Sequence, residues 1–289
     1  MKNFDRGIEL AERGMELNKM HERAVKYLRE EAVRPEDFHD YDRTVISEDD
    51  AYVRAMKEAF ERNETPEDRE AKQIADTLEA IVLEFGEQGY WFGGEDEDVT
   101  TLKTAEYDDI KNGVDIIVEA YRKDGNGGGS ELGLAIDVTY RKDLVAKMER
   151  IRDEVRSGKL STVRYFYSPH RDERRQSSIP RVVAGISAEH AMELGRLWMA
   201  QKNKQLSEHP VQIVFLEEME AQLSAFLVIA EREGRSHAKR AIADALATVR
   251  KTLDEKDDFI EEHQEEIRNY KLNDPVYALL MESVRSIAK

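Results

Sequence analysis

Three segments decide the fold: TLEAIVLEFGEQGYW (residues 77–91), GVDIIVEAY (113–121) and LGLAIDVTY (132–140). In the first segment, apolar residues recur every three or four positions, which predicts an amphipathic helix. In each of the other two segments, every second residue is apolar, and the residues between them include acids. This alternation predicts two β-strands, each with one fully apolar face. The sequence therefore predicts a helix packed on a sheet that carries acidic side chains.

One acid in each segment lies among apolar neighbours: Glu79, Asp115 and Asp137. Ionised carboxylates are costly in such surroundings unless a positive charge compensates them. If the two strands are neighbours, Asp115 and Asp137 lie about 5 Å apart and repel each other unless a cation intervenes. Mg²⁺ prefers oxygen ligands, and two or three carboxylates suffice to hold it. The three acids therefore predict a site for Mg²⁺ or Mn²⁺ and, through it, phosphodiester chemistry.

The composition is that of a globular protein with much exposed helix: 289 residues, 40% hydrophobic and 36% charged. No apolar run approaches the ~20 residues of a membrane span, and the first residues, MKNFDRGIEL, lack the apolar core of a secretory signal. The absence of cysteine excludes disulfides, thiolate metal sites and cysteine nucleophiles. These features predict a cytoplasmic protein without a membrane partner.

The net charge of −17 argues against broad, non-specific binding of nucleic acid, which needs clustered lysine and arginine. Segment 164–181 is a local exception because it is rich in arginine. We expect it to be a loop between two strands, and a possible contact for a nucleic-acid backbone. Tyr165 and Tyr167 share strand parity and alternate with Phe166, so all three cannot be buried. One aromatic face is therefore predicted to be open for stacking on a base.

The chain divides into a helical N-terminal extension (1–70), an α/β core (71–206) and a helical C-terminal region (207–289). The core alternates helix and strand signals: helix 66–88, strands 99–105, 113–121 and 132–140, helix 142–157, strands 161–168 and 179–186, and helix 187–205. The sequence thus predicts an α+β fold whose mixed sheet is flanked by helices.

Capping signals place the ends of several helices. Thr65 is expected to cap the 66–88 helix with Pro66 at its first position, and Ser47 to cap a helix in the N-terminal extension. In the C-terminal region we expect helices over 211–233 and from Ser236 to about Tyr270. A last short helix should begin after Asn273-Asp274-Pro275. Leucines and other apolar residues at helical spacing predict a helical core or a surface for a homo-oligomer.

The core resembles the PD-(D/E)XK, or restriction-endonuclease-like, nuclease superfamily. In that family a helix supplies a Glu, the second strand an Asp, and the third strand a (D/E)-x-K triplet. The matching positions are Glu79 in LEAIVLEFGEQGY, Asp115 in GVDIIVEA and Asp137 in AIDVTY, and the resemblance covers about residues 70–187. It implies a nuclease in which these three acids bind Mg²⁺ or Mn²⁺ and cleave DNA or RNA.

The sequence departs from the family at the lysine of the triplet, where Thr139 stands. In the family that lysine helps to orient and activate the attacking water. Three cations are candidates to replace it: Lys142 just after the strand, Arg141, and Lys72 two turns before Glu79 on the same helical stripe. We favour Lys142 for its proximity, and the catalytic set predicted from the resemblance is Glu79, Asp115, Asp137 and Lys142.

Other readings remain open at the sequence level. Asp108 and Asp109 are expected in a turn and are runner-up ligands, and Glu119 shares the strand parity of Asp115. The missing lysine also allows a catalytically inactive protein that acts as a binding or assembly module through its C-terminal helices. The seven histidines are scattered, and no G-x-S-x-G or strand-linked G-x-G-x-x-G is present, so zinc, serine-hydrolase and dinucleotide sites have no support.

Overall fold

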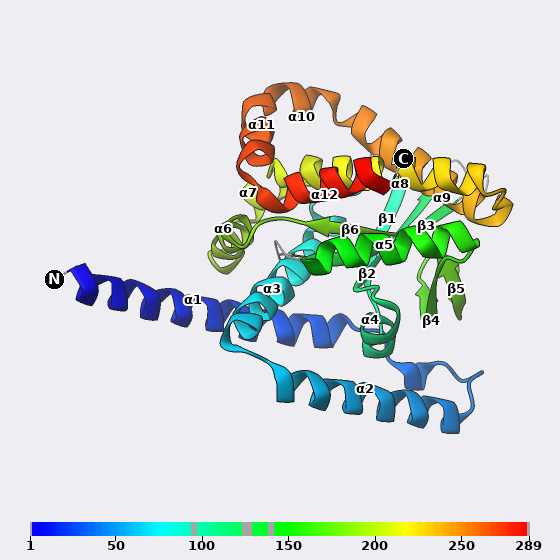
Figure 1. The fold of residues 1–289 in the computed structure, drawn as a ribbon, viewed down its shortest axis with the longest axis horizontal. Helices are drawn as coiled ribbons and strands as arrows, with labels where there is room; N and C mark the ends of the chain where they lie inside the picture. Colours follow the sequence, from blue (N-terminus) through cyan, green and yellow to red (C-terminus); the bar gives the residue numbers. More distant parts are fainter. Residues whose placement is uncertain (1, 94–96, 123–128, 138–141, 288–289) are drawn as a thin grey trace.

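The computed structural model describes residues 2–93, 97–122, 129–137 and 142–287, and their side chains apart from 2–11, 97, 122, 129–131, 133–137 and 142–143. It has the predicted α+β architecture, with two small sheets among many helices (Figure 1). The N-terminal helices lie on one side of the larger sheet in this view, and the C-terminal helices lie on the other (Figure 1).

The larger sheet has four strands: β1 (Glu97–Lys103), β2 (Ile116–Arg122), β3 (Gly129–Asp137) and β6 (Arg181–Gly185). Their order is β1-β2-β3-β6. The first three strands form an antiparallel meander in which Ile116 pairs with Leu134, and β6 runs parallel to β3 with Gly185 beside Asp137. Because β2 runs antiparallel to β3, the start of β2 and the end of β3 meet at one end of the sheet.

Helix α3 (Pro66–Gln88) packs against β1, β2 and β3 and also against α1 (Lys2–Glu31). It begins as predicted: Thr65 and Asp68 form a capping box, with Pro66 at the first helical position. Its apolar stripe joins Ile116 and Val118 of β2 in the main hydrophobic cluster. The opposite side of β2, at Ile117, packs instead on the second sheet.

The second sheet is a hairpin of β4 (Ser161–Ser168) and β5 (Glu173–Ile179). Strand β4 has the predicted bounds, but segment 164–181 is not the loop that we expected, since most of it belongs to these strands. The reason is packing: the hairpin buries Val163 and Ile179 against β2, which a solvated loop would not do. Helix α5 (Lys142–Ser157) precedes the hairpin, and its bounds match the prediction.

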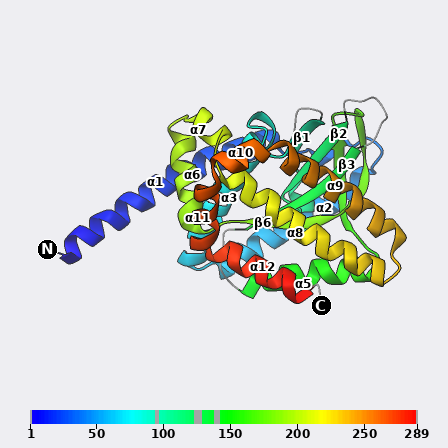
Figure 2. The same ribbon diagram turned by 90° about the horizontal axis from the view of Figure 1, so that it is seen from above.

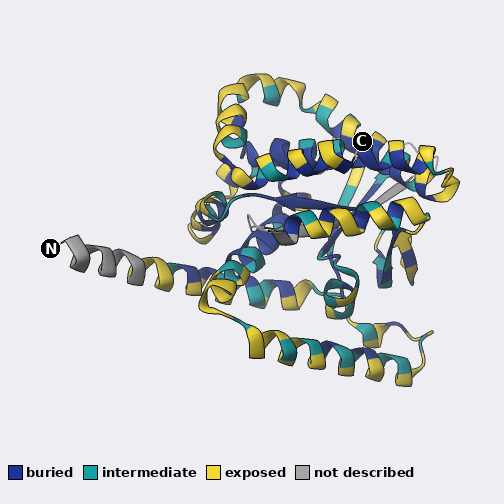
Figure 3. Ribbon diagram, in the orientation of Figure 1, coloured by how far each residue is buried: buried dark blue, intermediate teal, exposed yellow. Residues whose placement is uncertain are grey.

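The C-terminal helices surround α8 (Val211–Arg232), which Figure 2 shows running through the middle of this group. Helices α5, α9 (Ser236–Glu255), α11 (Gln264–Asn273) and α12 (Pro275–Ile287) all contact it. Figure 3 shows α8 in dark blue over much of its length, because it is apolar around most of its circumference. The main hydrophobic cluster takes residues from α1, the sheet and these helices together.

Two polar side chains of α8 close the open edge of β6. Gln222 accepts from the Val183 N–H at 2.8 Å and donates to the Val183 carbonyl at 2.7 Å, as a neighbouring strand would. One turn earlier, the buried Glu218 accepts from the Gly185 N–H at 3.0 Å. Burial raises the pKa of Glu218 well above its usual value. These bonds satisfy an edge that would otherwise be unpaired.

Further local expectations are corrected by the structure. Helix α2 (Arg43–Asn63) is capped by Asp42, whose side chain accepts from the Thr44 N–H, and not by Ser47. The predicted 179–186 strand corresponds to β6, which begins at Arg181 because Ile179 ends β5. The predicted 187–205 helix is two helices, α6 (Ala188–Met199) and α7 (Asn203–Ser207).

The predicted 236–270 helix is also divided, into α9, α10 (Asp257–Glu262) and α11. Its first break lies at Lys256, whose ammonium donates at 2.8 Å to both the Tyr90 carbonyl and Gln212. These contacts turn the chain back over α8, so that Ile267 of α11 joins the main hydrophobic cluster. A straight helix could not make both contacts.

Candidate functional site

Lys103, the last residue of β1, is the centre of the candidate site. Its side chain is buried, and its ammonium lies 2.8 Å from Glu79 Oε1 of α3. The same ammonium lies 2.8 Å from Asp109 Oδ2 and 3.2 Å from the Asp115 carbonyl oxygen. Three separate segments therefore place oxygen atoms around one positive charge, at the end of the sheet where β2 begins.

The link between β1 and β2 explains this convergence. Helix α4 (Glu106–Asn112) fills the link and ends at Gly113, which has a left-handed conformation (φ 64°) that glycine adopts without strain. The turn sends the chain back so that Asp115, just before β2, meets Asp109. The Asp115 side chain is one of the groups that lower the pKa of Asp109, so the two acids belong to one site.

Burial and charge set the protonation of this group. Burial raises the pKa of Glu79 to about 7, although the Lys103 ammonium acts in the opposite direction. Burial disfavours the charged form of Lys103, but the Asp109 and Glu79 carboxylates raise the pKa of Lys103 above its ordinary value. For Asp109, a third of whose side chain is exposed, burial is outweighed by Lys103, and the pKa is lowered. The stable form has a protonated lysine.

The predicted site residues are brought together in part. Glu79 contacts the Lys103 ammonium through its carboxylate, and Asp115 contacts it through its backbone carbonyl. Asp137 ends β3 at the same end of the sheet, where its backbone pairs with Gly185, but its side chain lies outside the described residues. Lys142 is the first residue of α5, and its side chain is outside them too; Thr139 and Arg141 are not described at all.

Lys103 is the residue that sequence reasoning missed. It stands in a strand that was only weakly indicated, in VTTLKT, and nothing in its neighbourhood marked it as buried. The usable signal was its position: a lysine at the end of the first strand is adjacent to the start of the second, where Asp115 stands. Lys72, one of the proposed replacements, is exposed but contributes to the lowered pKa of Asp109.

The runner-up acids have different roles. Asp108 and Asp109 lie in α4 and not in a turn, and only Asp109 joins the site. Asp108 is fully buried and accepts from the backbone N–H groups of Arg164 and Tyr165 at 2.7 and 2.9 Å, so it anchors β4. Glu119, inside β2, accepts at 2.6 Å from the Ser168 hydroxyl and anchors the other end of β4. Both are structural contacts of the hairpin.

The donor set suits a hard divalent cation, because the three described atoms that contact the Lys103 ammonium are carboxylate or carbonyl oxygens. Within the side chains that the structure describes, no group of three or more acids and histidines is placed to hold a metal ion. Glu79 and Asp115 can supply two ligands, and a third would have to come from Asp137. The Lys103 ammonium meanwhile neutralises part of this negative charge.

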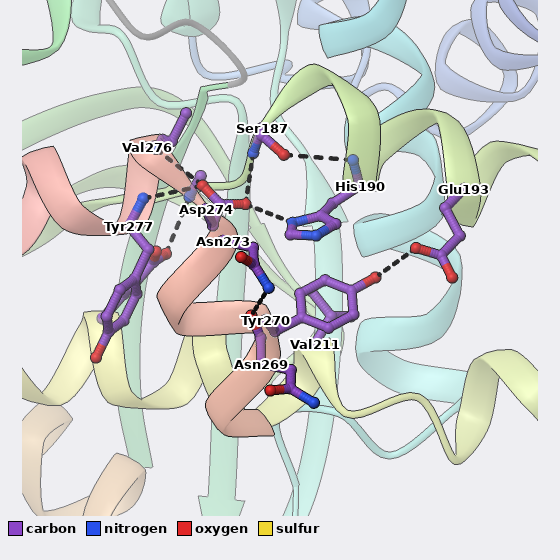
Figure 4. Close-up of polar contacts among 12 residues, drawn as sticks. Ser187, His190, Glu193, Val211, Asn269, Tyr270, Asn273, Asp274, Val276 and Tyr277 are labelled. Carbon is purple, nitrogen blue, oxygen red and sulfur yellow. Dashed lines mark hydrogen bonds and ion pairs between the residues drawn. The ribbon is translucent and has the colours of Figure 1, made fainter. Parts of the chain in front are cut away.

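A second cluster of polar side chains lies between α6 and α12 (Figure 4). The Asp274 side chain is fully buried and accepts four hydrogen bonds, from the Ser187, Val276 and Tyr277 N–H groups and from His190 Nδ1 at 2.7 Å. It caps α12, as the Asn273-Asp274-Pro275 signal predicted, and it ties that helix to α6. Burial opposes the charge of Asp274, but these donors lower its pKa. The cluster therefore has a structural role: it joins α12 to α6.

His209 completes this cluster through Tyr270. Its Nδ1 accepts from the Val211 N–H at 3.2 Å, so the proton of the neutral ring lies on Nε2, 3.5 Å from the Tyr270 hydroxyl oxygen. Tyr270 in turn donates to Glu193 at 3.1 Å. Burial, with a smaller contribution from His190, lowers the pKa of His209 to about 4.

This depressed pKa predicts acid lability. Between about pH 6.5, the ordinary value for histidine, and pH 4, the unfolded chain binds a proton at His209 that the folded chain does not, so stability falls as the pH falls. The expected loss is about 3 kcal/mol by pH 4. Urea unfolding at pH 7 and pH 4.5 should show a smaller loss for His209→Asn than for the wild type. Equal losses of unfolding free energy in both proteins would contradict the assignment to His209. The raised pKa of Glu79 has the opposite effect on stability, but it is present in both proteins and cancels in the comparison.

No described helix has the length and apolar character needed to span a membrane. Comparison with protein-family models, with curated proteins and with solved structures gave no match. The functional argument therefore rests on the geometry around Lys103.

Proposed function

We propose that this protein is a metal-dependent nuclease that hydrolyses phosphodiester bonds in DNA or RNA. The observation that carries the proposal is the buried Lys103, whose ammonium contacts Glu79 and Asp109 beside Asp115. A lysine among carboxylates is what the predicted site lacked, because Thr139 stands at the position of the family's lysine. Lys103 supplies the positive charge from β1 instead of β3.

The order of elements supports the resemblance to the restriction-endonuclease-like fold. A helix bearing Glu79 precedes the three-stranded meander, α5 follows, and β6 then pairs in parallel with β3. The hairpin β4–β5 is inserted between α5 and β6. Asp115 and Asp137 come to one end of the sheet, as the resemblance requires of its ligands.

The residues have distinct proposed roles. Glu79, Asp115 and Asp137 would hold Mg²⁺ or Mn²⁺, which when bound polarises the scissile phosphate and activates water. Because neighbouring carboxylates keep Lys103 protonated, it acts as a fixed positive charge for the phosphate and not as a general base. Asp109 positions that ammonium. Lys142 stays a second candidate for the same role.

A direct test compares the wild type with Asp115→Asn on single- and double-stranded DNA and RNA. We expect cleavage in Mg²⁺ or Mn²⁺, none with a chelator, and at least a hundredfold lower rate for Asp115→Asn, since the variant loses a metal-ligand charge. The control is Asp254→Asn, the same substitution at an exposed position of α9. Asp108→Asn is unsuitable because Asp108 is buried. Cleavage that is insensitive to chelator, or equal in both Asp115 proteins, would sink the proposal.

The alternative is a catalytically inactive, nuclease-like module that binds a partner or assembles through its C-terminal helices. A homo-oligomer is one form of such an assembly. One observation favours it: Lys103 already compensates Glu79 and Asp109, so these carboxylates need no metal for charge balance. Thermal melts separate the two functions. If the wild type gains no stability from Mn²⁺ while Lys103→Met does, the lysine replaces the ion and the inactive module is the better account.

A further inference from the structure

The solvent-facing side of the β4–β5 hairpin carries paired arginine and aromatic side chains. One face of the hairpin packs on β2 through Val163, Phe166 and Ile179. Tyr167 and Arg174 are cross-strand partners on the other face, and the Arg174 guanidinium lies 4.5 Å from the centre of the Tyr167 ring. A guanidinium stacked in this way keeps its N–H edges free to donate to phosphate.

This face depends on an irregularity in β4. The pairing with β5 shifts between Val163 and Phe166, so Tyr165 and Phe166 are both buried although they are consecutive. Of the three aromatic side chains, only Tyr167 is partly exposed, and it packs on the cluster that contains Phe38 and Tyr165. The physical reason is the bulge, since an extra residue changes the side to which the following side chains point.

A second pair lies at the hairpin tip. The ring of His170 stacks on Tyr121 of β2, with centroids 5.3 Å apart and planes 22° apart. The Arg171 guanidinium lies 5.7 Å from the centre of the same tyrosine ring. Arg171 and Arg174 are both exposed, and no ion pair joins either to a carboxylate among the described residues. The nearby Glu173 is engaged by Arg175 at 3.2 Å.

The hairpin is also joined to the candidate site. Asp108 holds the backbone of Arg164 and Tyr165, and the next residue, Asp109, contacts Lys103. Three residues along β4 separate Arg164 from Tyr167, about 10 Å. Six residues along β2 separate Asp115 from Tyr121, about 20 Å. Tyr121 lies on the hairpin side of β2, as Ile117 does, whereas Lys103 contacts Glu79 on the side that faces α3.

We propose that the Arg174–Tyr167 and Arg171–Tyr121 pairs form a binding surface for single-stranded nucleic acid on the hairpin side of the sheet. This rests on the proposed nuclease function and names its substrate class. Guanidinium planes stack on unpaired bases, whereas bases in a duplex are already stacked on each other. Two free arginines on a protein of net charge −17 neutralise few phosphates, which disfavours the higher charge density of a duplex.

The test measures binding in the presence of a chelator, so that cleavage does not interfere. The probes are fluorescein-labelled oligo(dT) and a DNA duplex of equal length. We expect oligo(dT) to bind more tightly than the duplex, and Arg171→Gln/Arg174→Gln to weaken oligo(dT) binding about tenfold or more. Losing two phosphate contacts should also reduce the slope of log affinity against log salt by about 1.4.

Two further variants make the result specific. Arg240→Gln removes an exposed arginine of α9, far along the chain from the hairpin, and should leave oligo(dT) binding unchanged. Arg171→Lys/Arg174→Lys keeps both charges but not the planar stack, so it should keep the salt slope and lose part of the affinity. The proposal would be overturned if the wild type bound the duplex more tightly than oligo(dT). It would also be overturned if the double glutamine variant bound oligo(dT) as tightly as the wild type.

The outcome is separable from that of the nuclease proposal. Arginine-dependent binding of oligo(dT) by a protein that cuts nothing in Mg²⁺ or Mn²⁺ supports the surface and rejects the nuclease. Metal-dependent cleavage that the double glutamine variant performs at the wild-type rate, with unchanged binding, rejects the surface and keeps the nuclease.

Discussion

Replacing Lys103 with methionine is expected to lower the rate of phosphodiester cleavage by about 10²–10³-fold, the usual cost of removing one charge-stabilising donor. Methionine can occupy much of the space of the lysine stem, so the variant should fold. Without the ammonium, Glu79 loses its compensating charge and should be protonated at neutral pH. The measurement is the initial rate on the best nucleic-acid substrate, alongside a thermal melt.

The other two lysines provide matched comparisons. Lys72→Met removes an exposed charge near Asp109 and should change the rate only a few-fold. Lys142→Met tests the cation that the sequence favoured. If Lys142→Met abolishes cleavage and Lys103→Met cleaves at the wild-type rate, the lysine of this site comes from the start of α5 and the assignment of Lys103 is wrong.

Replacing Asp274 with alanine is expected to destabilise the protein by about 3–5 kcal/mol, because several buried hydrogen-bond donors lose their acceptor at once. The buried N–H groups of Ser187 and Val276 lose their acceptor, and His190 loses its partner. Helix α12 loses its cap as well. Urea unfolding at pH 7 measures the change in the free energy of unfolding.

The control for this prediction is Asp254→Ala, an exposed aspartate near the end of α9, which should cost less than about 0.5 kcal/mol. Asp274→Asn should fall between the two, because an amide has one accepting oxygen where the carboxylate of Asp274 uses both. A loss below 1 kcal/mol for Asp274→Ala would show that the α6–α12 connection is held by apolar packing alone.

Local signals predicted the helices and strands around the site. The Thr65–Asp68 capping box, the Pro275 start of α12 and the bounds of α5 and β4 follow from short-range chemistry and from periodicity. The alternation also predicted β2 and β3 as strands. Glu79 and Asp115 could be selected because an acid within an apolar pattern is visible in the sequence.

Local signals failed where distant contacts decide the structure. Helix α4 has only seven residues, and its acids indicated a turn, yet Gly113 and the bonds from Asp108 to β4 make it a helix. Ser47 carried a good capping signal but lies inside α2, because Asp42 caps the helix first. The bulge in β4 inverted the side-chain parity that an uninterrupted strand would have.

By itself, the sequence determined the α+β class, the meander of three strands and the acids at its end, since periodicity and capping act within a few residues of the chain. Only the tertiary structure decided which cation stands among those acids. Lys103 and Glu79 are 24 positions apart, and no local pattern links a lysine that ends one strand to an acid inside a preceding helix. Packing α3 on β1 buries both, and burial makes each charge require the other.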